Sequence, residues 1–97
     1  MTATVTMYAK DACSYCRRAE GLLLERGCTD IRKLRIDLDP ALRTQMVERT
    51  GFRTVPQIYI GDVHIGGLDR LVELDRIGEL VQLLQTRDRH MSGDSTS

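Results

Sequence analysis

Residues 8–16 read YAKDACSYC and place two cysteines, Cys13 and Cys16, at the junction between a predicted strand and a predicted helix. Alternating apolar residues over Thr4–Tyr8 predict the strand. From Cys13 to about Arg26 the apolar residues recur at the spacing of one helix face, which predicts the helix. The C-x-x-C pair therefore lies at a strand-to-helix turn.

This position of the pair suits an anionic sulfur. The first turn of a helix has unpaired N–H groups and a partial positive charge, and both stabilise a thiolate. Lys10, Arg17 and Arg18 add positive charge on either side of the pair. Cys13 is therefore the predicted nucleophile, and Cys16, on the inward face, is the predicted resolving thiol that attacks a mixed disulfide.

Two other readings of the cysteines are weaker. A zinc site needs four ligands, and the remaining Cys28, His64 and His90 form no second paired motif. Two incidental core cysteines would not be separated by Ser14 and Tyr15 and flanked by cations. Cys28, just after the first helix, is predicted to be a small buried hydrophobe, with a regulatory thiol as the alternative.

The rest of the chain continues the alternation of strands and helices. Strands are predicted at 31–37, 56–60 and 63–65, and helices begin at Asp39-Pro40 and at Asp69, with Gly27 and Gly51 ending the first two helices. The last helix takes its apolar face from Leu71, Leu74, Ile77, Val81 and Leu84, and Gly78 could divide it. The order β-α-β-α-β-β-α predicts an α/β fold with a mixed four-stranded sheet and helices on both faces.

Length, charge and cysteine content limit the class of protein. The 97 residues fit one domain, expected over 1–86, with a disordered polar tail at 87–97. A net charge of zero argues against a nucleic-acid partner. No apolar run reaches the roughly 18–20 residues of a membrane span. The start shows no signal-peptide pattern, and three cysteines do not suit a disulfide-stapled scaffold, so the expected compartment is the cytoplasm.

Four blocks of residues, in this order, resemble the glutaredoxin family, in particular its short bacterial dithiol type. The blocks are Tyr8-x-Lys10-x-x-Cys13-Ser14-Tyr15-Cys16, Thr54-Val55-Pro56, Ile58-Tyr59-Ile60-Gly61 and Ile65-Gly66-Gly67-x-Asp69. The resemblance covers Thr4 to about Leu84. The absence of Trp speaks against thioredoxin proper, whose motif resembles Trp-Cys-Gly-Pro-Cys.

The resemblance implies a thioredoxin-like fold, a cis peptide bond before Pro56 and a glutathione site. Its glutathione-binding residues would be Lys10, Tyr15, Arg43, Thr54, Val55, Pro56, Gly67, Leu68 and Asp69. The Val55 backbone would pair with the cysteine of glutathione. Asp69 and nearby N–H groups would hold the γ-glutamyl end, and Lys10 and Arg43 the glycine carboxylate. Without the resemblance, Asp69 would be read as a helix N-cap and Arg43 as a solvated helix residue.

The chain departs from the family pattern at three positions. Ser14 stands where Pro is usual between the cysteines, Leu68 where many relatives have Cys, and Arg70 where an acidic or polar residue is common. Ser14 matters most, because some relatives with Cys-Ser-Tyr-Cys bind a bridging iron–sulfur cluster between two protomers, with glutathione supplying further ligands.

The predicted function is a glutathione-dependent thiol–disulfide oxidoreductase. It would reduce glutathione mixed disulfides through Cys13 and protein disulfides with Cys16 resolving. Its partners would be glutathione and glutathionylated or disulfide-containing proteins, with no nucleic acid, membrane or resident metal, and the chain would be a monomer. The alternative is a glutathione-ligated [2Fe-2S] carrier, dimeric through Cys13. A non-catalytic module is disfavoured because the catalytic blocks are intact.

Overall fold

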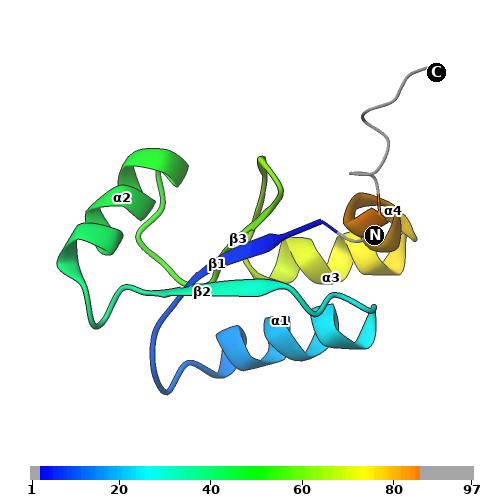
Figure 1. Cartoon of the computed structure of the whole chain (residues 1–97), viewed down its shortest axis with the longest axis horizontal. Helices are drawn as coiled ribbons and strands as arrows, with labels where there is room; N and C mark the ends of the chain where they lie inside the picture. Colours follow the sequence, from blue (N-terminus) through cyan, green and yellow to red (C-terminus); the bar gives the residue numbers. More distant parts are fainter. Residues whose placement is uncertain (1–2, 86–97) are drawn as a thin grey trace.

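The computed structural model describes residues 3–85, which contain eight helices and strands. In chain order they are β1 (Val5–Ala9), α1 (Ser14–Glu25), β2 (Ile31–Arg35), α2 (Pro40–Thr50), β3 (Gln57–Ile60), β4 (Val63–Gly66), α3 (Leu68–Arg76) and α4 (Glu79–Gln85). The sheet order is β2-β1-β3-β4, and Figure 1 labels the first three of these strands. β1 runs parallel to β2 and antiparallel to β3, and β4 runs antiparallel to β3. The predicted mixed sheet is confirmed.

Alternate side chains of the central strands point to opposite faces of the sheet, as the pleat of a strand requires. Val5 and Met7 belong to a core cluster that includes buried residues of α1, α3 and α4. Tyr8 and Tyr59 belong to a second cluster, which includes Met46 of α2. Figure 1 shows the same layers, with α1 and α3 on one side of the sheet and α2 on the other. The prediction of helices on both faces is therefore confirmed.

Local sequence signals fix the ends of the first two helices. Asp39 is the N-cap of α2 and accepts a hydrogen bond from the Ala41 N–H at 3.0 Å, while Pro40 occupies the first helical position. Gly51 ends α2 in the left-handed conformation, with φ of 79°. Gly27 follows the end of α1 with φ of 90°. These four predicted signals act as expected.

The last two helices differ from the prediction in two respects. Gly67, not Asp69, is the N-cap of α3, and Asp69 lies in the first turn, where its charge favours the helix dipole. Gly78, with φ of 84°, separates α3 from α4 and changes the phase of the apolar pattern. Ile77 and Val81, predicted on the buried face, are consequently exposed.

Cys28 lies in the core and is fully buried. Burial is the main cause that raises the pKa of its thiol. The prediction of a small buried hydrophobe is confirmed, and a thiol without solvent access is poorly suited to regulation.

Within residues 3–85 no helix has the length and apolar character that crossing a membrane demands. The predicted disordered tail at 87–97 lies outside the described residues. The N-terminal end of the described segment is held by its backbone, because the Ala3 N–H donates to the Leu84 carbonyl of α4 at 2.6 Å. The two ends of the described chain therefore lie together, away from the cysteine pair.

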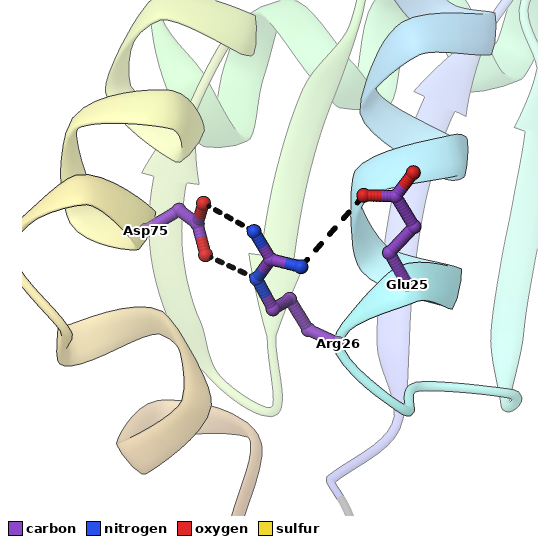
Figure 2. Close-up of polar contacts among 3 residues, drawn as sticks. All are labelled: Glu25, Arg26 and Asp75. Atoms are coloured by element: carbon purple, nitrogen blue, oxygen red, sulfur yellow. Dashed lines mark hydrogen bonds and ion pairs between the residues drawn. The ribbon is translucent and has the colours of Figure 1, made fainter.

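An ion pair joins the end of α1 to α3 (Figure 2). Arg26 donates to both carboxylate oxygens of Asp75, from Nε at 2.5 Å and from Nη2 at 2.9 Å. Figure 2 shows the same guanidinium reaching toward Glu25, at 3.7 Å. Hydrogen bonding from Arg26 lowers the pKa of Asp75. The bidentate geometry fixes the two helices at the end of the molecule opposite Cys13.

We expect Asp75→Asn to lower the melting temperature at pH 7 and to have less effect in acid. The folded-state pKa of Asp75 is depressed, so the ion pair stabilises the fold above the unfolded pKa near 3.8 and is lost as pH falls through the lower folded value. Thermal unfolding of both proteins between pH 7 and pH 3 tests this. Glu73→Gln, which removes the exposed pair with Arg70, is the control and should change little. An equal loss at every pH would contradict the linkage.

Candidate active site

Cys13 is the N-cap of α1, and its sulfur lies against the first turn of that helix. Cys13 Sγ accepts a hydrogen bond from the Cys16 N–H at 3.2 Å, and the Cys13 carbonyl accepts from the Arg17 N–H at 3.1 Å. Ala12 precedes it in the left-handed conformation, with φ of 56°. Such strained backbone at a non-glycine residue is frequent at functional sites. The turn thus directs the sulfur to the positive end of a helix, which stabilises an anion.

Cys16 differs from Cys13 in both access and protonation. Its side chain is 5% exposed, whereas that of Cys13 is partly exposed. Burial raises the pKa of Cys16 to about 11, hydrogen bonding with Cys13 acts in the same direction, and the Lys10 backbone opposes them. Cys16 is therefore a protonated thiol at neutral pH, and Cys13 is the thiol that solvent and substrates can reach.

The loop before β3 faces the N-terminus of α3 across a groove of about 650 Å³. The Val55–Pro56 peptide bond is cis, as the family resemblance implied. Gly66 has φ of 110°, a conformation that favours glycine, and a Cβ on Gly67 would lie 3.5 Å from the Pro56 carbonyl oxygen. The two walls of the groove therefore approach each other through their backbones.

A second groove, of about 350 Å³, adjoins the first and contains Cys13. Its cations come from three separate segments: Lys10 follows β1, Arg43 lies on α2, and Arg53 precedes β3. A third hollow, of about 220 Å³ on the side of β2, is the one lined by both Cys13 and Cys16 among the hollows described here. The cysteine pair thus lies between the grooves and this hollow.

The nine residues predicted to bind glutathione all line the two grooves. Lys10 and Arg43 line the smaller groove, Pro56, Gly67, Leu68 and Asp69 line the larger groove, and Tyr15, Thr54 and Val55 line both. Tyr15 is 56% exposed and lies at the start of α1. Three of the four sequence blocks, far apart in the chain, therefore meet on one surface, whereas Ile58-Tyr59-Ile60-Gly61 lines neither groove.

Gln57 and His64 form a contact that the sequence pattern did not indicate. Gln57 is 3% exposed and is the one buried polar residue recorded in the described part of the chain. Its Nε2 donates to the Thr54 carbonyl at 3.1 Å, and its Oε1 lies 2.9 Å from His64 Nε2. Because the Thr54 carbonyl can only accept, the Gln57 oxygen faces His64, which must donate from Nε2. The amide thus ties the loop before β3 to β4.

Phe52 and Arg53 were also missed. Phe52 lines the larger groove and Arg53 the smaller one, so this exposed segment runs beside both. One signal was available: both residues come directly before Thr54-Val55-Pro56, and residues next to a binding motif often line the same groove. For Gln57 and His64 the available signal was the predicted pairing of strands 56–60 and 63–65, which does not by itself specify a contact between these two side chains.

We expect Gln57→Leu to lower the free energy of unfolding by about 1–3 kcal/mol, the usual cost of unpaired buried polar groups. Leucine keeps the approximate volume but removes both hydrogen bonds, to Thr54 and to His64. Urea unfolding measures the change. Gln82→Leu, at an exposed position of α4, is the matched control and should remain within about 0.5 kcal/mol of the original protein. An equally small effect at Gln57 would mean that the bridge is not formed in solution.

Comparison with known proteins gives a consistent result. The family model described as Glutaredoxin matches residues 5–65. Glutaredoxin 3 of Escherichia coli K12 is 46% identical over 83 residues, which are 86% of this chain and 99% of that protein. The match therefore spans nearly the whole of this relative.

Solved structures with the same fold agree. The crystal structure of a buckwheat glutaredoxin–glutathione complex superposes with a TM-score of 0.77 at 33% identity, covering 84% of this chain and 76% of that one. The holo form of glutaredoxin C1 from Populus tremula x tremuloides gives a TM-score of 0.81 at 33% identity, covering 91% of this chain and 81% of that one. The predicted thioredoxin-like fold is thereby confirmed.

Proposed function

The chain belongs to the glutaredoxin family, and from that premise we propose that it reduces glutathione mixed disulfides through Cys13 and protein disulfides with Cys16 as the resolving thiol. Family membership implies thiol oxidoreductase activity. The observation that carries the finer proposal is the Cys13 sulfur, which accepts the Cys16 N–H at 3.2 Å and opens onto a cationic groove. A stabilised, accessible thiolate is the nucleophile that thiol–disulfide exchange requires.

Glutathione would lie across the two grooves. We place its γ-glutamyl end at Asp69 and the N-terminus of α3, because a carboxylate pairs with helix N–H groups and an ammonium with an aspartate. The glycine carboxylate would face Lys10 and Arg43 in the smaller groove. Val55, between the grooves, would pair through its backbone with the cysteine of glutathione, as an added strand does. This orientation brings the glutathione sulfur to Cys13.

The proposed reaction with a glutathionylated protein has two exchanges. The Cys13 thiolate attacks the glutathione sulfur, a new S–S bond forms, and the protein thiolate leaves and takes a proton from solvent. The thiolate of a second glutathione then attacks the glutathione sulfur of the adduct. Oxidised glutathione leaves and the Cys13 thiolate is regenerated. Cys16 takes no part in this route.

Protein disulfides would need the second cysteine. Cys13 attacks one sulfur of the substrate and releases the other as a thiolate, leaving the protein joined to Cys13. Cys16 then attacks the Cys13 sulfur, frees the second substrate thiolate and leaves a Cys13–Cys16 disulfide, which two molecules of glutathione reduce. The hollow lined by both cysteines supports this step, since it gives the buried Cys16 an opening beside Cys13.

The first test is glutathione-coupled reduction of a small glutathione mixed disulfide by the purified chain. Turnover that saturates with glutathione is expected. Negligible turnover would mean that the site binds glutathione for another purpose. We further propose that the working form is a monomer, which gel filtration with and without glutathione tests. We also propose that the protein acts in the cytoplasm.

A second candidate function, a glutathione-ligated [2Fe-2S] carrier, rests on Ser14. Ser14 is exposed in the smaller groove beside Cys13, where the family usually has Pro. Within residues 3–85 no group of three or more His, Cys, Asp or Glu side chains could hold a metal. Cys13 is therefore the ligand this site would offer, and the others would come from glutathione and a second copy. Because each copy would offer Cys13 alone, the cluster could be held only between two copies of the chain.

Visible absorption separates the two candidates. The carrier hypothesis predicts a brown protein, dimeric by gel filtration, after anaerobic purification with glutathione. It also predicts that Cys13→Ser abolishes the colour. A colourless monomer, even after cluster reconstitution, would exclude the carrier and leave the oxidoreductase.

A further inference from the structure

A hydrogen-bonded chain of side chains reaches from β4 to the loop that carries Val55. His64 Nε2 lies 2.9 Å from Gln57 Oε1, and Gln57 Nε2 donates to the Thr54 carbonyl at 3.1 Å. Gln57 is 3% exposed, so its amide has little access to water and depends on these partners. The Thr54 carbonyl is therefore held toward the buried amide and away from solvent.

The direction of the Thr54 carbonyl sets the direction of the next N–H group. A trans peptide unit is planar, and its C=O and N–H point in opposite directions. The Thr54–Val55 bond is trans, because the cis bond recorded in residues 3–85 is Val55–Pro56. The Val55 N–H therefore points away from Gln57. It makes no hydrogen bond within the described residues, and Val55 lines both grooves. This N–H is a donor left available to a ligand.

His64 contacts the loop before β3 at both of its ends. Its ring centroid lies 6.3 Å from that of Phe52, where the loop begins, and its Nε2 meets Gln57, where the loop joins β3. The Tyr59 ring, with its centroid at 5.0 Å, packs beside the same imidazole. The side chain of His64 thus links β4 to the whole length of this loop.

We propose that His64 and Gln57 are positioning residues, which keep the Val55 N–H directed at the cysteine backbone of bound glutathione. This inference rests on the proposed function, because that function assigns the backbone pairing to Val55. Without the bridge the Thr54–Val55 peptide can rotate, and its N–H is no longer fixed before glutathione arrives. The loss is the worth of about one hydrogen bond, which is about two- to tenfold in kcat/KM for a glutathionylated substrate.

Two measurements test this: glutathione-coupled reduction of a glutathionylated peptide, and the rate at which iodoacetamide alkylates Cys13. Gln57→Met keeps the side-chain length without the donor and is expected to lower kcat/KM by about two- to tenfold. His64→Leu should give a smaller loss, and His64→Gln, whose amide can still donate, should avoid most of it. Alkylation of Cys13 needs no glutathione and should be unchanged in every variant. Val63→Thr, at an exposed position of β4 that lines neither groove, is the control and should keep its kcat/KM.

A double variant separates positioning from direct contact. Gln57 and His64 both line the larger groove, so each side chain is also close enough to the site to contact glutathione on its own. Because the proposal has His64 act through Gln57, the double variant should lose no more kcat/KM than Gln57→Met alone. Two independent contacts with glutathione would instead make the losses multiply. Thermal unfolding establishes that each variant is folded at the assay temperature.

Several results would overturn the inference while leaving the oxidoreductase function intact. Unchanged kcat/KM in Gln57→Met would mean that the bridge contributes to stability alone, and full activity in His64→Leu would remove His64 from the proposal. A parallel fall in the alkylation rate would mean that the variants act on Cys13. Losses that multiply in the double variant, or an equal loss in Val63→Thr, would also contradict it. No turnover of the peptide by an original chain whose Cys13 is still alkylated would instead refute the proposed function, and this inference with it.

Discussion

Cys13→Ser is expected to lower the glutathione-coupled reduction of a small glutathione mixed disulfide by about 10³-fold or more, since removal of a covalent nucleophile costs at least this much in related catalysis. A serine hydroxyl stays protonated at neutral pH and cannot form the mixed disulfide. The Cys16 thiol cannot take over, because it is 5% exposed and its pKa is raised to about 11. The coupled assay at pH 7, corrected for uncatalysed exchange, measures the loss.

The control for this variant must show that the fold and the grooves are intact. Serine can occupy the N-cap of α1 as cysteine does, since a hydroxyl accepts the N–H of the third helical residue. We therefore expect Cys13→Ser to unfold at a temperature close to that of the original chain. Cys28→Ala, which removes a fully buried thiol outside the grooves, should keep its turnover. A Cys13→Ser protein that is folded and retains a tenth of the activity would place the nucleophile elsewhere.

Sequence patterns predicted the elements whose ends are set locally. Asp39 and Pro40 begin α2, and Gly51 ends it, because a cap, a fixed φ and a left-handed residue act on their own neighbours. The start of α3 was misjudged because Gly67, in extended conformation, provides the cap by backbone alone. The sequence indicated that Gly78 could divide the last helix but did not decide whether it does. That depends on tertiary packing, because the break lets Leu80 become fully buried.

The candidate site divides in the same way. Cys13 and Cys16 were predictable because one helix turn determines their chemistry. The bridge from Gln57 to His64 was not, since it needs β3 and β4 in register. The place of Arg53 in the smaller groove was also not predictable, because that groove forms only where three separate segments of the chain come together.

Cys16→Ser should separate the two proposed reactions: it is expected to retain reduction of glutathione mixed disulfides within about twofold and to lose most reduction of protein disulfides. With its pKa raised to about 11, chiefly by burial, Cys16 is a protonated thiol at pH 7 and competes weakly with glutathione for the Cys13 adduct. Free glutathione approaches the Cys13 adduct from solvent and does not need Cys16. The two coupled assays, run on one preparation, give the comparison.

The pH dependence of the resolving step gives a second, independent test of the role of Cys16. Because burial raises the pKa of Cys16, its thiolate becomes more populated as pH rises, so the rate at which Cys16 resolves a protein mixed disulfide should increase with pH above neutrality. Burial, the largest cause of the shift, persists while a substrate is attached to Cys13. Single-turnover release of a labelled substrate between pH 7 and pH 9 measures that rate. A flat profile would show that deprotonation of Cys16 does not limit the resolving step. Complete loss of mixed-disulfide activity in Cys16→Ser would show that the glutathione route through Cys13 alone is wrong.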